Sequence, residues 1–469
     1  MKTQRILALC LLTFVFAAGG LFAQQRIAGD WEGAIVLPQM SLGMIVHFTG
    51  PDDSLRATID IPVQRAMGLE LTNVRATPPS LHFELPAGPG VAVFEGTLAG
   101  DSITGDFRQA GITAKFRLHR TSGSKPAEVV VPPPYREEEV RIAHEDVTLA
   151  GTLSMPPAGG PFPAVILITG SGAQNRDEEI LGFAPFKILA DHLTRQGFAV
   201  LRCDDRGVGG STGSMSTSTT ADFATDVRAM LQYLKKRPEI QTAKIGLLGH
   251  SEGSHVAAMV AAGSPEVAFA VLLAGPGIRG DSLILSQIQA LGRAQGESEE
   301  NIQRGLALQR RVFATVRAQE GWEELRATLM GEMRWSLDRL PAEQKASMSN
   351  PDSLLAARTD MQMEAVRSPW FGFFASYDPA NDLAKIRCPV LAIFGELDQQ
   401  VPPGLNLQPM KAALSKHGNP DITVTVIPGV NHLFQKAVTG SPMEYAGLEK
   451  RFAEGFLDLL TEWLNKRAH

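Results

Sequence analysis

The stretch Lys244-Ile-Gly-Leu-Leu-Gly-His-Ser-Glu-Gly-Ser-His-Val-Ala-Ala-Met259 decides the fold. Apolar residues lead into a corner of small residues, and a segment rich in Ala and Met follows without a spacer, which indicates a buried strand that turns directly into a helix. Within it, Gly249-His-Ser-Glu-Gly253 matches the G-x-S-x-G nucleophile elbow, where a serine hydroxyl is exposed on a strained corner. Gly249 and Gly253 carry no side chains that would clash where strand and helix approach. Ser251 is therefore the candidate nucleophile.

The segments around this corner alternate between strand and helix. A hairpin is expected from 139–143 and 147–154, apolar strands at 163–168, 198–203, 245–248 and 269–273, and helices at about 185–196 and 220–237. Strands with a continuous apolar run are buried on both faces, as in a mostly parallel sheet covered by helices. In such a sheet the functional residues gather at the carboxyl ends of the strands.

A long helical stretch interrupts this alternation. From about 281 to 382 the sequence contains only helical segments, and strand character resumes at 389–394. We interpret the interruption as a helical cap inserted into the sheet domain. The cap closes with Trp370-Phe-Gly-Phe-Phe374. These rings either pack the cap on the core or, for Trp370 and Phe371, line an apolar substrate pocket.

Two downstream loops can supply a base and an acid for Ser251. A serine hydroxyl is a poor nucleophile unless a base accepts its proton and a carboxylate orients that base. Asp398 follows the strand at 389–394, and His432 follows a strand at 422–427. The order Ser, Asp, His along the chain is that of an α/β-hydrolase. Glu396 is the rival acid, and Asp398 is preferred because it lies further into the loop.

Two backbone amides are expected to form an oxyanion hole beside Ser251. One belongs to Glu252, whose side chain is expected to be solvated or salt-bridged, and the other to Ser171 or Gly172 in the loop 169–178. His250 is interpreted as structural support for the elbow. The glycines of the loop lack the G-x-x-x-x-G-K-[ST] and G-x-G-x-x-G spacings, which argues against a nucleotide site.

The N-terminal part of the chain has a different pattern. Between 25 and 120, short alternating stretches are separated by turn residues, which indicates a small antiparallel barrel or sandwich. His47, His82 and His119 occur singly inside its strands, where a solvated or hydrogen-bonded histidine is expected rather than a ligand. A linker at 121–136, rich in Ser, Gly and Pro, separates this domain from the sheet domain at 137–469.

The first 23 residues have the order of a secretory signal peptide. Lys2 and Arg5 precede an apolar run at 6–16, and small residues follow up to Ala23. The run is short for a membrane anchor, and the residues around Cys10 do not suit a lipoprotein, so the sequence predicts export to the periplasm or the extracellular space without stable membrane insertion.

Net charge and cysteine number argue against nucleic acid, a disulfide framework and a metal site. The formal charge of −6 provides no basic field for nucleic acid. Cys203 and Cys388 are the cysteines of the expected mature chain, which excludes a disulfide framework and a metal site of ordinary spacing. Both are expected to be free, buried thiols on well-separated strands.

Four motifs carry a family resemblance. Thr169-Gly-Ser-Gly-Ala-Gln-Asn-Arg-Asp-Glu178, Asp205-Arg-Gly-Val-Gly-Gly-Ser211, the elbow and Asn431-His-Leu-Phe434 resemble bacterial carboxylesterases of the serine aminopeptidase-like, S33-type group of α/β-hydrolases. Several members of that group carry a β-rich N-terminal extension, as is expected here. The family's usual His-Gly before the oxyanion loop is Thr169-Gly170 in this chain. The resemblance also implies a sheet order that separates the two cysteine-bearing strands.

The sequence therefore predicts an exported serine hydrolase for small-molecule carboxylic esters. Ser251 is the nucleophile, His432 the base and Asp398 its orienting acid, with an acyl-enzyme intermediate and no metal or organic cofactor. A serine aminopeptidase is the nearest alternative, and it would need acids such as Asp360 or Glu364 near the cap to hold a substrate amine. A second alternative is a lipid- or glycan-binding protein whose hydrolase is vestigial.

Overall fold

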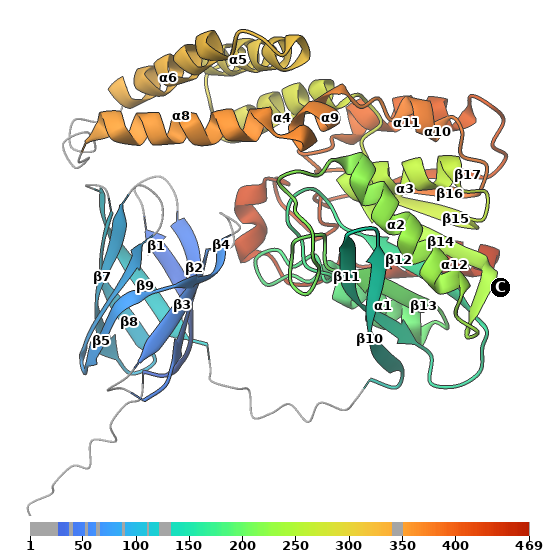
Figure 1. The fold of residues 1–469 in the computed structure, drawn as a ribbon, viewed down its shortest axis with the longest axis horizontal. Helices are drawn as coiled ribbons and strands as arrows, with labels where there is room; N and C mark the ends of the chain where they lie inside the picture. Colours follow the sequence, from blue (N-terminus) through green and yellow to red (C-terminus); the bar gives the residue numbers. More distant parts are fainter. Residues whose placement is uncertain are drawn as a thin grey trace, which may run out of the picture. The chain divides into compact units, whose positions relative to one another are not determined.

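A computed structural model of the chain describes residues 27–36, 41–51, 55–61, 66–86, 90–109, 112–121, 133–339 and 350–468. The chain divides into two compact units, one built on β1 to β9 and the other on β10 to α12 (Figure 1). The predicted signal peptide at 1–23 and most of the predicted linker at 121–136 lie outside the described residues.

The N-terminal unit is one curved antiparallel sheet. Its strands are β1 (Gly29–Val36), β2 (Ser41–Thr49), β3 (Arg56–Ile61), β4 (Ala66–Glu70), β5 (Thr72–Thr77), β6 (Ser80–Pro86), β7 (Val91–Ala99), β8 (Ser102–Gln109) and β9 (Ile112–Arg120). They follow the order β4-β3-β2-β1-β9-β8-β7-β6-β5, so the sheet is a nearly closed barrel and not a two-layer sandwich (Figure 1). The sequence did not predict β4 and β5.

Aromatic side chains fill the concave side of this sheet. Burial alternates along β7, and its Phe94 stacks on Phe83 with ring centroids 4.5 Å apart and meets Phe116 edge to face at 5.4 Å. His47 and His82 lie on the strands and bond to carboxylates, for example His47 Nδ1 to Asp30 at 2.8 Å. The expected role of these histidines as hydrogen-bonded strand residues is confirmed.

The C-terminal unit is built on an eight-stranded mixed sheet. Its strands are β10 (Arg136–His144), β11 (Val147–Met155), β12 (Phe162–Ile168), β13 (Ala199–Cys203), β14 (Ile240–His250), β15 (Phe269–Leu273), β16 (Val390–Gly395) and β17 (Ile422–Ile427). The order is β10-β11-β13-β12-β14-β15-β16-β17, with β10 and β11 antiparallel and the pairs from β13 to β17 parallel. The chain has the α/β-hydrolase fold that the sequence predicts.

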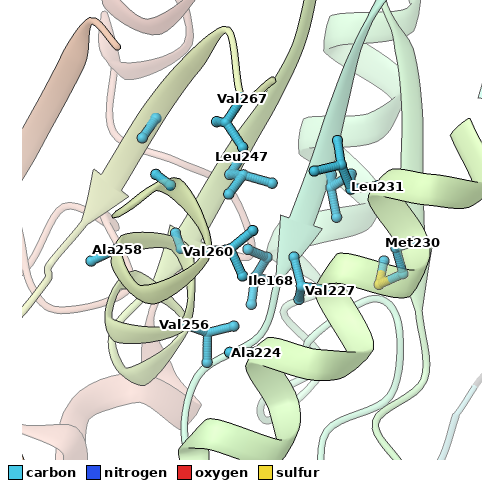
Figure 2. Close-up of a cluster of buried hydrophobic side chains, with 14 of the residues drawn as sticks. Ile168, Ala224, Val227, Met230, Leu231, Leu247, Val256, Ala258, Val260 and Val267 are labelled. Atoms are coloured by element: carbon cyan, nitrogen blue, oxygen red, sulfur yellow. The ribbon is translucent and has the colours of Figure 1, made fainter. Parts of the chain in front are cut away.

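Helices cover both faces of this sheet. The covering helices are α1 (Pro185–Arg195), α2 (Thr220–Lys235), α3 (Glu252–Gly263), α11 (Pro403–Ser415) and α12 (Phe456–Ala468). Helices α2, α3 and α11 share one apolar cluster with the sheet, and α1 and α12 share the other. Figure 2 shows part of the first cluster, which includes Ile168 and Leu247 of the sheet, Val227 of α2 and Val256 of α3. Helix α2 starts at a capping box of Thr219 and Asp222, which satisfies otherwise unpaired amides.

The predicted cap consists of α4 (Gly280–Ala294), α5 (Glu299–Ala318), α6 (Trp322–Asp338), α8 (Pro351–Arg367), α9 (Pro369–Ser376) and α10 (Ala380–Leu383). Helices α5, α6 and α8 pack against one another (Figure 1). They have an apolar cluster of their own around Val312, Leu325 and Met363. Among the described residues, none of the helices combines the length and the apolar character that crossing a membrane requires.

The two cysteines are free, as expected, but differ in burial. Cys203 ends β13 and is buried, whereas Cys388 precedes β16 and is only partly buried. Strands β12, β14 and β15 lie between β13 and β16, so the two thiols belong to well-separated parts of the sheet. The expectation of full burial is wrong for Cys388 because it stands in the entry to its strand rather than within it.

Candidate active site

Ser251 stands at the corner between β14 and α3. Its backbone has φ 53° and ψ −117°, a strained conformation for a residue with a side chain. A Cβ on Gly249 would lie 2.0 Å from the carbonyl oxygen of Gly253, and one on Gly253 would lie 2.2 Å from that of Ile168. The corner therefore requires glycine at both positions, as the sequence predicts.

Asp398 and His432 come together at the ends of β16 and β17. His432 Nδ1 lies 2.7 Å from Asp398 Oδ2, and both side chains are buried. Asp398 Oδ1 accepts two backbone N–H bonds of 2.8 Å, from Gln400 and Val401. The carboxylate is therefore fixed by the turn that follows it and orients the imidazole ring.

Glu396 takes a different position from Asp398. Its side chain is exposed, and Oε2 accepts a 2.8 Å hydrogen bond from the amide of Gly429. Glu396 thus braces the loop that carries His432, whereas Asp398 contacts the ring. Among the hydrogen bonds of the described residues, none joins Ser251 Oγ to His432.

The loop that carries His432 is shaped by Asn431. This buried amide accepts bonds from the N–H groups of Leu433 and Gln435 at 3.0 and 2.9 Å. Phe434 takes φ 59°, a left-handed conformation that such a tight turn requires. The motif Asn431-His-Leu-Phe434 is thus a rigid turn with His432 at its tip.

The predicted oxyanion loop passes directly beside Ser251. A Cβ on Gly170 would lie 3.3 Å from the Cβ of Ser251, so only glycine allows this approach comfortably. The Gly170 amide donates to Glu178 Oε1 at 2.7 Å, which leaves the following amides, Ser171 and Gly172, as candidates for the hole. The Glu252 amide is the first of α3, where amides have no acceptor within the helix.

Carboxylates at the end of β13 anchor this loop. Arg176 donates to Asp204 through its side chain and its amide, each at 2.9 Å, and Asp205 accepts from Thr169 Oγ1 at 2.6 Å and from the Gln174 amide at 2.9 Å. The resemblance-bearing motifs at 169–178 and 205–211 are therefore two halves of one hydrogen-bonded unit.

Asp205 differs electrostatically from the other acids near the elbow. Burial, the largest cause, and the charges of Glu178 and Glu252 together raise its pKa to about 8, although the hydrogen bonds from Thr169 and Gln174 lower it. A carboxyl with this pKa holds its proton over much of the neutral range. Negative charge beside the oxyanion loop is thereby reduced.

His250 connects three parts of the site. Its Nδ1 lies 2.9 Å from Glu178 Oε1, and its Nε2 lies 3.0 Å from the backbone oxygen of His432. The rings of His250 and His432 are 4.8 Å apart at their centroids. The interpretation of His250 as structural support is consistent with these contacts, but the sequence did not predict its partner Glu178.

Glu252 faces the cap rather than solvent. Its side chain is buried, and Oε1 accepts bonds from Thr220 Oγ1 at 2.6 Å and from the indole N–H of Trp370 at 2.7 Å. The expectation of a solvated side chain is therefore wrong. The physical reason is that α9 of the cap and the start of α2 both reach the first turn of α3.

The two rings predicted to bind substrate occupy different places. Trp370 stacks on Phe374 with centroids 5.1 Å apart and reaches Glu252, the residue after Ser251. Phe371 stacks on Phe313 at 6.0 Å and belongs to the cap's own apolar cluster. The structure thus brings Trp370 to the elbow and places Phe371 in the packing of the cap. Substrate contact by either ring stays a prediction.

Within the described part of the chain, no group of three or more His, Cys, Asp and Glu residues is arranged to hold a metal ion. Several polar side chains around Ser251 bond to one another, including Asp398, Glu178 and Asp205.

More than half of the chain matches a known protein family. The family model described as serine aminopeptidase, S33, matches residues 184–436, which is more than half of the chain. The chain belongs to this family. It is an enzyme of the α/β-hydrolase superfamily, and the match spans the elbow, the cap, Asp398 and His432.

Curated relatives include esterases and thioesterases. Esterase EstD of Thermotoga maritima is 29% identical over 161 residues, which are 33% of this chain and 38% of EstD. Human mitochondrial acyl-coenzyme A thioesterase 2 is 28% identical over 145 residues, 31% of this chain and 26% of the thioesterase. The matches thus span well under two thirds of either relative.

Solved structures with a similar chain path include an esterase from Pyrococcus furiosus, at 19% identity and a TM-score of 0.42, covering 71% of this chain and 92% of that one. Another is a proline iminopeptidase from Mycobacterium smegmatis, at 16% identity and a TM-score of 0.41, covering 71% and 99%.

Proposed function

We propose that the protein is an exported serine esterase in which Ser251, His432 and Asp398 act as a catalytic triad. The observation that carries the proposal is the 2.7 Å bond between His432 and Asp398, with the His432 ring 4.8 Å from that of His250, the residue before the strained Ser251. A geometry of this kind gives the histidine a fixed tautomer, with Nδ1–H on the carboxylate and Nε2 able to accept the serine proton.

The reaction then proceeds in two half-reactions. Ser251 Oγ attacks the ester carbonyl carbon while His432 Nε2 takes its proton, and the amides of Glu252 and of Ser171 or Gly172 donate to the oxyanion. The bond to the alcohol oxygen breaks as His432 returns the proton to it. Water, deprotonated by His432, attacks the acyl-enzyme, and the carboxylic acid leaves as the Ser251 hydroxyl is restored.

A substrate panel tests this proposal. The mature chain is expected to hydrolyse chromogenic acyl esters of several chain lengths, and Ser251→Ala is expected to abolish turnover. Retained turnover in Ser251→Ala would refute the assignment of the nucleophile. A matched change at a serine outside the site, Ser254→Ala, separates loss of chemistry from loss of fold, because Ser254 Oγ bonds only backbone carbonyls of Gly249 and Leu273.

One feature of the cap favours a second candidate, an aminopeptidase. A cleft of about 950 Å³ between α6, α8 and the segment around Ser216 is lined by Glu323, Asp360 and Glu364 together with Arg326 and Arg367. Arg326 pairs with Asp360 at 2.8 Å, so the acids Glu323 and Glu364 dominate the remaining charge. Such a cleft would suit a substrate ammonium group.

Aminoacyl arylamides compared with acyl esters distinguish the two functions. Under the esterase proposal, esters are turned over faster by far, and Glu364→Gln leaves their KM unchanged. Faster turnover of arylamides, with a KM that rises in Glu364→Gln, would favour the aminopeptidase. Export is tested separately, by finding the mature N-terminus near residue 24 in a secreted or periplasmic fraction.

A further inference from the structure

Two buried side chains outside the proposed triad, Glu178 and His250, join the three segments that carry the reaction. Glu178 Oε1 accepts from the Gly170 amide of the oxyanion loop at 2.7 Å and faces His250 Nδ1 of the elbow at 2.9 Å. His250 Nε2 faces the carbonyl oxygen of His432 at 3.0 Å. The relative exposure of Glu178 is 1% and that of His250 is 5%, so water does not compete for these contacts.

The partners of the two ring nitrogens indicate the protonation state of His250. A backbone carbonyl can only accept, so Nε2 must carry a hydrogen to bond His432. A carboxylate also accepts, and Glu178 Oε1 already takes the Gly170 N–H. Both ring nitrogens therefore face acceptors, and the ring that satisfies both is the doubly protonated imidazolium, paired with the Glu178 carboxylate.

The charges around the ring agree with this geometry. Burial lowers the pKa of His250, but the charge and hydrogen bond of Glu178, the His432 carbonyl and the charge of Asp398 outweigh burial, so the pKa is raised. Another titratable group near the ring is His432, whose ring centroid lies 4.8 Å from that of His250. Phe434, which carries no charge, packs against the His250 ring edge to face. The three segments also each contain a non-glycine residue with positive φ: Glu178 at 51°, Ser251 at 53° and Phe434 at 59°.

We propose that the His250–Glu178 ion pair is a positioning device for the general base, which sets the distance of His432 from Ser251 and the place of the oxyanion loop. His432 is held at two points, by Asp398 at the ring and by His250 at the backbone. Loss of the second point lets the rigid turn 431–434 shift as a unit while the bond to Asp398 stays intact. The proposal rests on the proposed triad.

Two substitutions of His250 separate its contact with Glu178 from its contact with His432. His250→Asn places an amide nitrogen near Nδ1, which keeps a donor for Glu178 and removes the tether to His432. His250→Gln places its amide nitrogen near Nε2, which keeps the tether and removes the partner of Glu178. We expect His250→Asn to lower kcat for an acyl ester by about 100-fold with little change in KM, the scale of a small misplacement of a catalytic group. His250→Gln should lose less than about tenfold.

The pH profile supplies a readout that a merely structural role would not move. When His250 loses one proton, the Glu178 carboxylate keeps the remaining hydrogen on Nδ1, so Nε2 no longer donates to His432 and kcat should fall on the alkaline side. Glu178→Gln removes the charge that raises the pKa of His250, so this alkaline limb should move to lower pH. His250→Gln has no group that titrates there, so the limb should disappear. His255→Asn, a change at another buried histidine of α3, should leave the limb in place.

The outcomes separate the two proposals. If Ser251 of the wild type does not react with a fluorophosphonate, the triad itself fails. If it reacts, two results would overturn the positioning role. One is a kcat of His250→Asn within about threefold of the wild-type value, and the other is a lower kcat in His250→Gln than in His250→Asn. If circular dichroism shows that His250→Asn does not fold, the pH profile of Glu178→Gln is the deciding measurement. An alkaline fall in kcat at the same pH as in the wild type would then overturn the proposal.

Discussion

Two buried histidines on opposite sides of the elbow, His250 and His255, have pKa values shifted in opposite directions. On the side of His432, His250 lies between a carboxylate and a carbonyl, and its pKa is raised. On the side of the cap, His255 packs between Phe374 and Tyr377, and burial lowers its pKa to about 4. Both rings are buried in the same short segment. The partners, and not burial, decide which histidine carries charge.

The side of His432 and the side of the cap are expected to have different roles. The charged side holds in place the atoms that we propose to move protons, because ion pairs and backbone hydrogen bonds define directions. On the cap side, aromatic rings surround His255, and Glu252 joins Thr220 and Trp370. We therefore expect changes on the charged side to act on kcat, and changes on the cap side to act on stability and substrate choice.

The largest effect is expected on the charged side, at the acid that orients His432. Asp398→Asn should lower kcat by about 10⁴-fold, the loss seen when the orienting aspartate of a serine protease becomes asparagine. Steady-state ester hydrolysis measures it. Glu396→Gln is the matched control, since Glu396 bonds a backbone amide and its change should cost less than about threefold. Reversed results would identify Glu396 as the acid.

The next effect lies on the cap side and concerns stability. The folded-state pKa of His255, about 4, is below its unfolded value near 6.5, so the unfolded chain binds the proton first. Stability from this group is complete above about pH 6.5 and is lost as pH falls toward 4, by roughly 3 kcal/mol. Denaturant unfolding at several pH values should show this loss in the wild type and a smaller one in His255→Asn. Equal losses in the two proteins would contradict it.

The smallest effect concerns the bond between cap and elbow. Trp370→Phe keeps a ring against Phe374 but removes the donor to Glu252, which should cost about 1 kcal/mol of stability and shift the preference among acyl chain lengths. Trp463→Phe loses a comparable indole bond, to Thr423 on the far side of the sheet domain. The control should lose similar stability with an unchanged substrate profile. Identical profiles in both variants would argue against a role of Trp370 in specificity.

Much of the site could be predicted because its residues follow recognisable strand ends. Apolar runs locate β14, β16 and β17, and Ser251, Asp398 and His432 come directly after them. The glycines of the elbow could be predicted because the strand and helix meet there without a spacer. Local pattern was enough in each case.

What could not be predicted depends on contacts between distant segments. Glu178 and His250 are 72 residues apart, and nothing in either motif reveals that their side chains meet. The burial of Glu252 depends on where the cap lies, which helical periodicity does not give. Strand β5 was missed because Thr72-Asn-Val-Arg-Ala-Thr77 is mostly exposed and lacks an apolar face, and β4 because Gly68, at φ 62°, interrupts its pattern.

The central claim is that Ser251 is an activated nucleophile, and covalent labelling tests it most directly. The mature chain is treated with a fluorophosphonate probe, and the modified peptide is identified by mass spectrometry. The account predicts one label per chain, on Ser251, that is absent in Ser251→Ala and strongly slowed in Asp398→Asn. A protein that is folded but unlabelled, or labelled at another residue, would contradict it.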